Sequence, residues 1–441
     1  MATSKTALDT IAAPATPVGR GALAIVRIDG PASARILQEL SGVSPDVRMA
    51  TLMELSTYGD ILDQCIAVRY AAPHSFTGND LVELTLHGGP VTVARTLRAI
   101  LGRGARPAEP GEFTERAVLN GKLDLLQAEA IADLVDARTE LQAAVSIANL
   151  EGALSRKAAA IRESLLLVIA RLEAALDFSE EGYQFIRQEE ARGTMARALD
   201  DSRALLDSYR RGAATRAGLE AVILGRPNAG KSTLLNRLIG SERAIVTPIP
   251  GTTRDIVRET IEIGGLPVTI SDTAGLRETT DVVEGIGVER ARNAATAADL
   301  VLYLIDATQG ITEEDRAEIV RWPEAWMLYA KSDLAAAPAG TMAISAITDA
   351  GVAELLATLD AFVRHRFVAP EASLVNERQR QAVAECASGL ADAVASLDAG
   401  HDEQIVLVDL YRAANALGVL IGAITREDIF EEIFSKFCIG K

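Results

Sequence analysis

Short apolar runs separated by polar loops dominate the first part of the chain, up to about residue 120. The runs at residues 23–27, 64–69 and 81–86 predict strands, and the last of them alternates apolar and polar positions. Gly88, Gly89 and Pro90 end that strand, and a helical pattern follows at residues 91–101. The pattern predicts a mixed α/β segment at the N-terminus.

Residues 123–209 have a different pattern, rich in Ala, Leu, Glu and Arg and poor in Pro and Gly. Apolar residues recur there at three- and four-residue steps, as in Leu165, Val168, Ile169, Leu172 and Leu176. This spacing predicts long amphipathic helices, with a break near Gly182 and Tyr183. The same helical pattern resumes after Pro370 and continues to the end of the chain.

Residues 218–370, between the two helical stretches, return to alternating strands and helices. Six apolar runs predict strands, at residues 221–224, 257–263, 268–271, 300–305, 326–329 and 342–345. The Gly-bearing link at 264–267 predicts a hairpin, and Pro267 is expected just ahead of its strand, where a missing N–H does little harm. The expected fold is a mostly parallel sheet with one antiparallel edge and helices on both faces.

The helical pattern on both sides of this segment indicates that an α/β domain is inserted into a helical domain, because insertions enter at exposed loops. A chain of 441 residues suits about three domains. We expect an N-terminal domain at 1–120, a helical domain at 121–216 and 373–441, and the inserted domain at 217–372. Two independent helical domains are the alternative.

Residues 225–232 read G-R-P-N-A-G-K-S, which follows the phosphate-binding pattern G-x-x-x-x-G-K-[ST]. A strand-like run precedes the loop and a helix-like run follows it, and this context gives the pattern its meaning. Lys231 supplies a charge for the outer phosphates, Ser232 supplies a hydroxyl for Mg²⁺, and the helix points its positive end at the anion. The expected nucleotide contacts on this loop are Asn228, Ala229, Gly230, Lys231, Ser232 and Thr233.

Two further runs suit a switch that senses the γ-phosphate. The run D-T-A-G at 272–275 follows a strand, so Asp272 can hold Mg²⁺ through water and Gly275 lets a backbone N–H approach the γ-phosphate. The run G-T-T-R-D at 251–255 can complete the Mg²⁺ shell while the γ-phosphate is present. The expected nucleotide contacts in these runs are Thr252, Thr253, Asp272, Thr273, Ala274 and Gly275, and Thr247, ahead of the first run, is expected to join them.

Lys331-Ser-Asp333 predicts recognition of guanine, because an Asp accepts hydrogen bonds from the guanine N1–H and amino group. The stem of Lys331 can cover the base, and Ser345 and Ala346 can present backbone N–H to guanine O6. The chain has Ala330 where the run familiar in GTPases, N-K-x-D, has Asn. We expect this difference to weaken nucleotide binding and to preserve the preference for guanine.

Hydrolysis of GTP needs a group that orients water, and Leu276, directly after D-T-A-G, has no polar atom for this task. The chain is therefore a slow switch, or its catalytic group comes from elsewhere. Arg277, Glu278 and Glu284 lie nearby in sequence, and a charged surface helix is the simpler interpretation of these residues.

Composition and charge further restrict the functions and locations that the sequence allows. The net charge of −17 argues against a surface that coats nucleic acid in general, but it does not exclude a local basic patch that docks one RNA. The three cysteines, Cys65, Cys386 and Cys438, form no C-x-x-C spacing, which suits a reduced cytosolic compartment. The N-terminus has no apolar signal core, and the longest apolar stretch, at 413–424, is short for a membrane span and is expected to be a buried helix.

The whole chain resembles the MnmE (TrmE) family of tRNA-modification GTPases. The resemblance lies in A-T-P-V-G-R-G-A-L-A-I-V-R at 15–27, S-F-T-G-N-D-L-V-E-L-T-L-H-G-G-P at 75–90, P-G-E-F-T-E-R-A-V-L-N-G-K-L-D-L at 110–125, the GTPase runs above and the final F-C-I-G-K. It implies an N-terminal folate-binding domain, a central helical domain and a G domain inserted in the helical domain.

The resemblance also implies a role and partners. Such proteins act as homodimers with a flavoprotein, MnmG (also called GidA), in a heterotetramer or larger complex in the cytoplasm, without a membrane. Together they add a carboxymethylaminomethyl or aminomethyl group to the 5-position of wobble uridine 34 of tRNA, with a one-carbon unit from a tetrahydrofolate derivative. FAD and NADH belong to the partner, which agrees with the lack of G-x-G-x-x-G in this chain.

Site residues follow from the resemblance at matching positions. Mg²⁺ would be held by Ser232 and Thr253, water would be oriented by Glu284, and hydrolysis would require two G domains to meet face to face. The proposed K⁺ ligands are Asn228, Thr247, Ile249 and Thr252, and the proposed folate contacts are Arg27, Glu83, Lys122 and Lys441. Pro248 and Pro250 depart from the commoner residues of the K⁺ loop, and the role of Cys438 is open.

Two other functions are compatible with parts of the sequence. One is a regulatory GTPase that times the assembly of ribosomes or another RNA–protein particle, and the other is a folate-binding protein with a vestigial nucleotide domain. The N-terminal motifs and the F-C-I-G-K tail argue against the first, and Lys231, Ser232 and Asp272 argue against the second.

Overall fold

The computed structural model describes residues 9–178, 185–240, 258–272, 292–368, 373–424 and 427–441. The chain divides into two compact units, one of residues 1–132, 149–194 and 392–441 and the other of residues 133–148 and 195–391. Each unit contains one six-stranded sheet and part of a set of long helices.

The first sheet has the strand order β3-β4-β5-β2-β1-β6, and its neighbouring strands are antiparallel except for the β1–β6 pair. Its strands are β1 (Ile11–Pro14), β2 (Leu23–Asp29), β3 (Thr51–Thr57), β4 (Asp60–Tyr70), β5 (Leu81–His87) and β6 (Arg106–Pro107). The helices of this region are α1 (Ser33–Ser41), α2 (Pro90–Leu101) and α3 (Glu112–Leu119). The predicted strands at 23–27, 64–69 and 81–86 are confirmed as β2, β4 and β5, and the helix at 91–101 as α2, whereas β1, β3, β6, α1 and α3 were not predicted.

Alternating positions divide this sheet into a face packed on α1 and α2 and an opposite face, called the open face below, that is covered in part where Ile11, Ala13 and Leu81 pack with Phe113. Val26, Ala67 and Leu84 lie side by side across β2, β5 and β4 and are buried in a core that includes residues of α1 and α2. The side chains of the next row point to the opposite face of the sheet, and this row contains Arg27 and Glu83. A polar row on the open face is what the period of two in a strand dictates.

Among the described residues, seven further helices lie outside the two sheet-containing regions. They are α4 (Leu125–Asp136), α5 (Glu140–Leu150), α6 (Ala153–Asp177), α7 (Gln188–Ala217), α12 (Glu377–Asp398), α13 (Glu403–Ile421) and α14 (Glu427–Phe434). These confirm the predicted long helices, with Leu165, Val168, Ile169 and Leu172 on the buried face of α6. The predicted break at Gly182 and Tyr183 lies outside the described residues.

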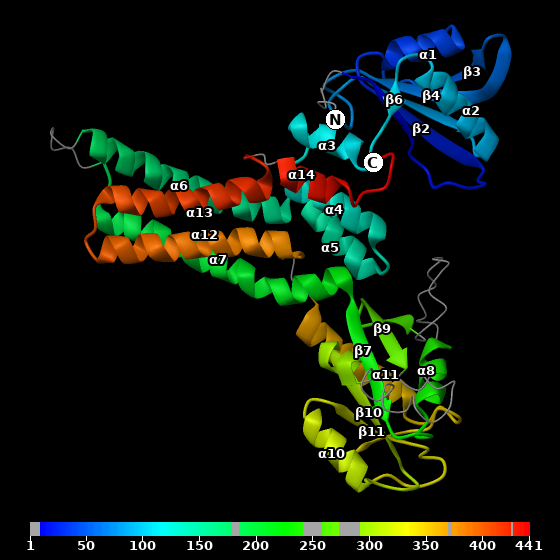
Figure 1. Cartoon of the computed structure of the whole chain (residues 1–441), viewed down its shortest axis with the longest axis vertical. Helices are drawn as coiled ribbons and strands as arrows, with labels where there is room; N and C mark the ends of the chain where they lie inside the picture. The colour runs from blue at the N-terminus through cyan, green and yellow to red at the C-terminus, as the bar shows by residue number, and fades with distance from the viewer. Residues whose placement is uncertain (1–8, 179–184, 241–257, 273–291, 369–372, 425–426) are drawn as a thin grey trace. The chain divides into compact units, whose positions relative to one another are not determined.

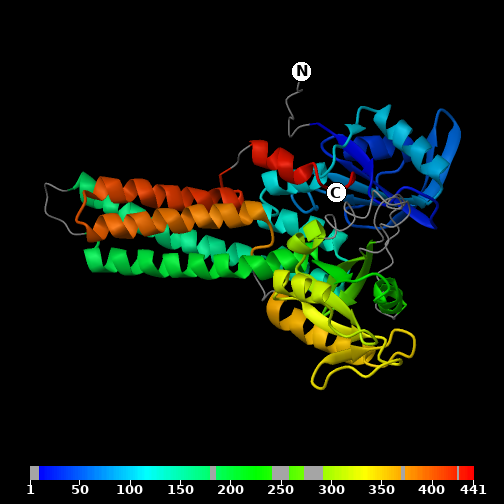
Figure 2. The same cartoon turned by 60° about the horizontal axis from the view of Figure 1, so that its bottom comes forward.

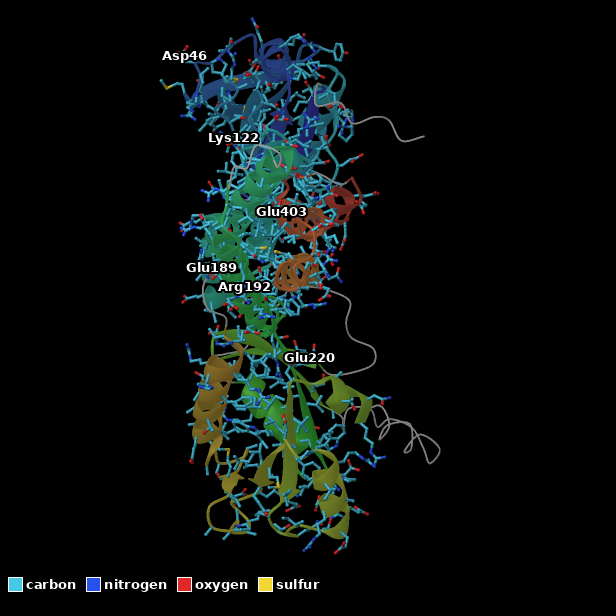
Figure 3. The ribbon with its side chains drawn as sticks, turned by 90° about the vertical axis from the view of Figure 1, so that its left-hand side faces the viewer. Asp46, Lys122, Glu189, Arg192, Glu220 and Glu403 are labelled. Carbon is cyan, nitrogen blue, oxygen red and sulfur yellow. The ribbon has the colours of Figure 1, made fainter. Side chains whose placement is uncertain are left out.

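Helices from before and after the inserted segment pack together. In the first unit, α6 lies along α13, and Arg192 of α7, labelled in Figure 3, pairs with Asp398 of α12. In the second unit, Ser202 Oγ of α7 lies 3.7 Å from Cys386 Sγ of α12. These contacts favour one helical domain over two independent ones, and Figures 1 and 2 show the same pairing of helices.

The apolar stretch predicted at 413–424 corresponds to the second half of α13, which ends at Ile421. Among the described helices, α13 is the one whose length and composition would suit a membrane span. Leu410, Ala413 and Leu417 are buried, as expected of a helix inside a protein core.

The second sheet has the order β12-β11-β10-β7-β9-β8 and is parallel except for the β8–β9 pair. Its strands are β7 (Leu219–Gly225), β8 (Arg258–Ile263), β9 (Leu266–Asp272), β10 (Leu300–Asp306), β11 (Trp326–Ala330) and β12 (Met342–Ile344), and its main helices are α8 (Lys231–Ile239), α10 (Glu313–Arg321) and α11 (Val352–Phe367). One face packs on α8 and α11, and residues of the other face pack near α10. The mixed sheet with covered faces confirms the predicted fold.

The β8–β9 hairpin differs from the prediction in one detail. Only Gly264 and Gly265 form the link, both with positive φ, as a type I′ turn requires. Pro267 is therefore the second residue of β9, opposite Glu262, and not the residue ahead of it. The parallel pairing with β7 begins only at Val268, so the missing N–H of Pro267 costs no bond on that side.

Candidate active site

The phosphate-binding loop runs from the last residue of β7, Gly225, to the first residue of α8, Lys231. Gly225 has a φ of +140°, and a Cβ at this position would lie 2.5 Å from the carbonyl oxygen of Leu304 on β10. Asn228 and Gly230 also have positive φ, at 62° and 99°. The loop curls tightly against β10, and glycine is required at Gly225 for both reasons.

Lys231 folds back across this loop. Its Nζ donates hydrogen bonds to the carbonyl oxygens of Gly225, at 2.9 Å, and of Arg226, at 2.8 Å. The residue is only 7 % exposed, so its charge lies within the loop at the N-terminus of α8. A buried ammonium and a helix N-terminus at one place form a site suited to an anion.

The other predicted nucleotide contacts in the described residues lie at the same edge of the second sheet. Asp272 is the last residue of β9 and stands opposite Ile223 of β7, while Ser232 and Thr233 belong to the first turn of α8. Parallel strands present their carboxyl ends at one edge, where α/β folds bind ligands. The structure thus brings the phosphate-binding and Asp272 segments to one edge, visible around β7, β9 and α8 in Figure 1.

The segment after β11 is held by neighbouring backbone. Lys331 has a φ of +61°, and the N–H of Ser332 donates to the carbonyl oxygen of Ile344 on β12 at 3.1 Å. Asp333 is exposed, free to project toward a base. Its role toward guanine stays a prediction.

The segment after β12 is also ordered by internal bonds. The N–H of Ser345 donates to the carbonyl oxygen of Ala350 and is therefore not presented to guanine O6 as predicted, and the Ser345 hydroxyl accepts from the N–H of Thr348 at 3.2 Å. Ser345 is buried and Ala346 is half-buried. An ion pair between Arg237 of α8 and Asp349 fixes the end of this loop.

Asp306, the last residue of β10, was not predicted as part of the site. Its Oδ2 lies 2.7 Å from Nζ of Lys331, and its Oδ1 accepts from the N–H and hydroxyl of Thr308. Burial opposes its ionisation, but Lys331 and Thr308 hold the pKa of Asp306 below its ordinary value. The signal was present in the sequence, since Asp306 follows the apolar run at 300–305 just as Asp272 follows the run at 268–271.

Ala330 lies against the phosphate-binding loop. Its Cβ is 3.9 Å from the position that a Cβ on Gly230 would occupy, and the residue is buried. A longer polar side chain at position 330 would therefore reach the phosphate-binding loop. The Asn of N-K-x-D could make this contact, and Ala330 cannot.

Ala330→Asn is expected to lower the dissociation constant for GTP about two- to tenfold, since one net hydrogen bond contributes about 0.5–1.5 kcal/mol. The measurement is titration with a fluorescent guanine nucleotide. Ala336→Asn, in the exposed part of the same loop, is the control and should leave affinity unchanged. Unchanged or weaker binding by Ala330→Asn would refute the prediction.

A second group of predicted residues meets on the open face of the first sheet. Arg27 Nε lies 2.9 Å from Glu83 Oε1, and the two residues are direct cross-strand partners on β2 and β5. The Tyr70 hydroxyl lies 3.5 Å from Glu83 Oε2, and the Arg27 guanidinium lies 5.5 Å from the centroid of the Phe76 ring. Tyr70 and Phe76 add aromatic surface to this group, which we did not predict from the sequence.

The C-terminal tail docks beside this ion pair. Ile439 forms a bridge with Pro110, and the Arg27 guanidinium donates to the carbonyl oxygen of Gly440 at 3.4 Å. Gly440 has a φ of +98°, and a Cβ there would lie 2.0 Å from the carbonyl oxygen of Pro14. Only glycine permits this approach, so the tail reaches the sheet because of Gly440.

Lys441 and Lys122 lie around the same face. Burial and the neighbouring Arg27 guanidinium lower the pKa of the Lys441 ammonium. Lys122, labelled in Figure 3, donates from Nζ to the carbonyl oxygen of Pro73 at 3.3 Å, in the loop that also carries Phe76. The structure thus brings Arg27, Glu83 and Lys441 together and places Lys122 on the adjoining loop, while Cys438 is exposed.

Sequence comparison with known families covers both regions. A family model described as the MnmE helical domain matches residues 125–438, and a model described as the GTP-binding protein TrmE N-terminus matches residues 10–122. The chain belongs to the MnmE (TrmE) family. This confirms, over nearly the whole length of the chain, the family resemblance that the sequence motifs indicate.

Curated relatives agree with this assignment. Proteins named tRNA modification GTPase MnmE are 43 % identical in Symbiobacterium thermophilum (98 % of this chain and 99 % of the relative) and 44 % identical in Methylorubrum populi (98 % of each). The Nitrosomonas europaea protein of that name is 42 % identical over 99 % of this chain and all of the relative. Among solved structures, Aquifex aeolicus Era bound to GDP and aluminium fluoride matches 39 % of this chain and 66 % of its own, with 27 % identity and a TM-score of 0.27.

Several predicted site residues lie outside the described residues. They are Thr247, Ile249, Thr252, Thr253, Thr273, Ala274, Gly275 and Glu284. Their roles stay predictions, as does the effect of Pro248 and Pro250, which also lie outside the described residues.

Proposed function

We propose that this chain hydrolyses GTP and, with a flavoprotein of the MnmG (GidA) type, modifies the 5-position of wobble uridine 34 of tRNA. The added group is carboxymethylaminomethyl or aminomethyl, with its one-carbon unit from a tetrahydrofolate derivative. One observation carries the proposal: a phosphate-binding loop and a tail-docked Arg27–Glu83 site occur in one chain of the MnmE family. We also propose the boundaries 1–120, 121–216, 217–372 and 373–441, a homodimer, and a cytoplasmic location.

At the nucleotide site, the chain's own residues bind and orient GTP. Lys231 exchanges its bonds to the Gly225 and Arg226 carbonyls for the outer phosphates, and Asp333 selects guanine. Ser232 and Thr253 would hold Mg²⁺, which supplies charge neutralisation between the β- and γ-phosphates. The Asp306 carboxylate is a positioning group that holds Lys331 beside the base.

The switch segments would complete the site when two G domains meet. Glu284 orients the attacking water, and the oxygens of Asn228, Thr247, Ile249 and Thr252 would hold K⁺, which supplies positive charge for the transition state.

At the N-terminal site, the donor set suits a reduced folate. Glu83 can accept hydrogen bonds from the amino-pyrimidine edge of a pterin, and the cationic Arg27, Lys122 and Lys441 suit the glutamate carboxylates. The tail contributes one of these cations, so the site is complete only when the tail docks against Pro14 and Pro110.

Glu83→Gln is expected to weaken the binding of a chemically stable reduced folate about tenfold or more, because a hydrogen bond to a charged group contributes about 1.5–3 kcal/mol. Isothermal titration calorimetry on the full-length protein checks this. Glu54→Gln, at an exposed position of β3, removes the same charge, and this variant should bind folate normally. Equal affinities for the two variants would show that Glu83 does not contact the ligand.

GTP turnover is expected to be at least about tenfold faster in KCl than in NaCl of the same concentration. This is a small part of the ~10³–10⁵-fold rate increase that an arginine finger, whose place K⁺ would take, contributes. Steady-state phosphate release at matched ionic strength measures the effect. Equal rates in the two salts would contradict the K⁺ site.

Mass spectrometry of wobble uridine from cells that lack this chain tests the proposed function. The 5-substituted nucleosides should disappear and return with the wild-type chain but not with a Lys231→Ala chain. Normal wobble uridine in the deletion strain would overturn the proposal and favour the regulatory GTPase instead.

A further inference from the structure

The turn that follows β10 lies between the two loops that are expected to hold the nucleotide. In the second sheet, β10 is the neighbour of β7, which leads into the phosphate-binding loop, and of β11, which leads into residues 330–333 (Figure 1). We call residues 330–333 the base-reading loop and residues 306–310 the β10 turn. All three strands are parallel, so the β10 turn and the two loops leave the sheet at the same edge.

The β10 turn contacts the phosphate-binding loop through Arg226. Nη1 of Arg226 donates to Oε1 of Gln309 at 2.9 Å, and Nε of Arg226 donates to Oε2 of Glu314, in the first turn of α10, at 3.0 Å. The carbonyl oxygen of Arg226 also accepts a hydrogen bond from Nζ of Lys231 at 2.8 Å. Gln309 therefore restrains the backbone that carries one of the hydrogen-bond acceptors of Lys231.

The same turn contacts the base-reading loop through Lys331 and Ala330. Oδ2 of Asp306 lies 2.7 Å from Nζ of Lys331, and the Asp306 side chain is only 12 % exposed. The N–H of Ala307 donates to the carbonyl oxygen of Ala330 at 3.0 Å. One side-chain contact and one backbone contact thus connect the β10 turn to the base-reading loop.

Internal hydrogen bonds make the β10 turn a stiff connection. The N–H groups of Gln309 and Gly310 both donate to the carbonyl oxygen of Asp306 at 3.0 Å, and Gly310 has a φ of +66°. Oδ1 of Asp306 accepts from the N–H and the hydroxyl of Thr308. Because Asp306 and Gln309 are held in one small turn, a displacement of the phosphate-binding loop is transmitted to Lys331.

A surface ion pair is the simpler explanation of one of these contacts. Arg226 and Glu314 are both partly exposed, and such pairs are common on protein surfaces. This explanation does not cover Gln309, which has no charge, or the second contact of the same turn with Lys331. Ala330 adds the missing reason, because its methyl group cannot form the hydrogen bond by which an Asn would join the base-reading loop to the phosphate-binding loop.

We infer that the β10 turn is a brace between the phosphate-binding loop and the base-reading loop, and that it takes the place of the Asn side chain that position 330 lacks. Gln309 is a positioning residue, since it acts on the nucleotide through Arg226. The inference rests on the proposed function, because it requires a guanine nucleotide between the two loops. A brace that orders both loops in advance lowers the cost of binding and slows the release of the nucleotide.

The test is a double-mutant cycle at positions 309 and 330 of the full-length protein, with the dissociation rate of a fluorescent GDP analogue as the measurement. Gln309→Ala should speed dissociation about two- to fivefold, the range expected for one contact of a partly exposed arginine. Combined with Ala330→Asn, the same change should alter the rate less than about 1.5-fold, because the Asn side chain then joins the two loops directly. Gln404→Ala, at an exposed position of α13, is the matched control and should release the nucleotide as wild type does.

An unchanged dissociation rate for Gln309→Ala would overturn the inference. So would an equal effect of Gln309→Ala with and without Ala330→Asn, since a merely structural role of Gln309 would not depend on position 330. The melting temperature of Gln309→Ala should stay at the wild-type value, which separates the brace from a loss of stability. The proposed function fails separately, through normal wobble uridine in cells without the chain, and that result does not depend on Gln309.

Discussion

Glu284→Ala is expected to bind GTP normally and to hydrolyse it about 10²–10⁴-fold more slowly, the usual contribution of a group that acts on a proton in the transition state. The physical reason is that Leu276 offers no polar atom for the attacking water, so another side chain must orient it. Glu284 is the residue that we propose for this task, on the resemblance to the MnmE family alone, and it lies outside the described residues. Nucleotide affinity and single-turnover phosphate release, measured on the same preparation in KCl, separate binding from chemistry.

Glu278→Ala is the matched control, because it removes the same side chain six residues earlier in the same segment. It should hydrolyse GTP at close to the wild-type rate. If Glu284→Ala retains turnover and Glu278→Ala loses it, the catalytic role belongs to Glu278. Loss of GTP binding by Glu284→Ala would instead indicate a role in organising the switch.

Arg116→Gln is expected to destabilise the N-terminal domain by about 3–5 kcal/mol, the cost of leaving a buried charge without its partner. Arg116 donates to Asp29 Oδ2 at 2.9 Å and also contacts Glu112 and Asp9. Asp29 is fully buried and Glu112 nearly so, and neither carboxylate can turn to water when the guanidinium is removed. Burial opposes ionisation of Asp9 and Glu112, but Arg106 and Arg116 hold the pKa of both carboxyls below their ordinary values.

Thermal unfolding of the full-length protein should show a transition about 10 °C or more lower for Arg116→Gln, given the usual relation between stability and melting temperature in a domain of this size. Arg35→Gln removes an arginine from the exposed pair with Glu39 on α1 and should change stability by less than about 0.5 kcal/mol. Similar melting temperatures for the two variants would show that Arg106 suffices for Asp9 and Glu112, and that Thr77 and Asn79 suffice for Asp29.

Local patterns predicted most of the second sheet and its nucleotide site. Strands β7, β9, β10, β11 and β12 have apolar runs because both faces of the sheet are covered, so each run is visible without knowledge of its neighbours. The phosphate-binding loop is equally local, since Gly225 to Ser232 are consecutive. The first sheet was harder: β1 has four residues and β6 only two, and such short strands have no readable period.

The sequence by itself determined the family, the inserted α/β domain and the phosphate-binding loop, because each depends on consecutive residues or on a repeating period, and it predicts the choice of guanine through Asp333 in the same way. Only the tertiary structure decided that Arg27 faces Glu83 across two strands, that Gly440 reaches Pro14, and that Asp306 holds Lys331. It also placed Arg210 and Arg366 on the ring of Phe367. These contacts join residues that are far apart in the chain. Strand register, tail docking and helix packing bring them together, and a local pattern of residues contains no information on any of the three.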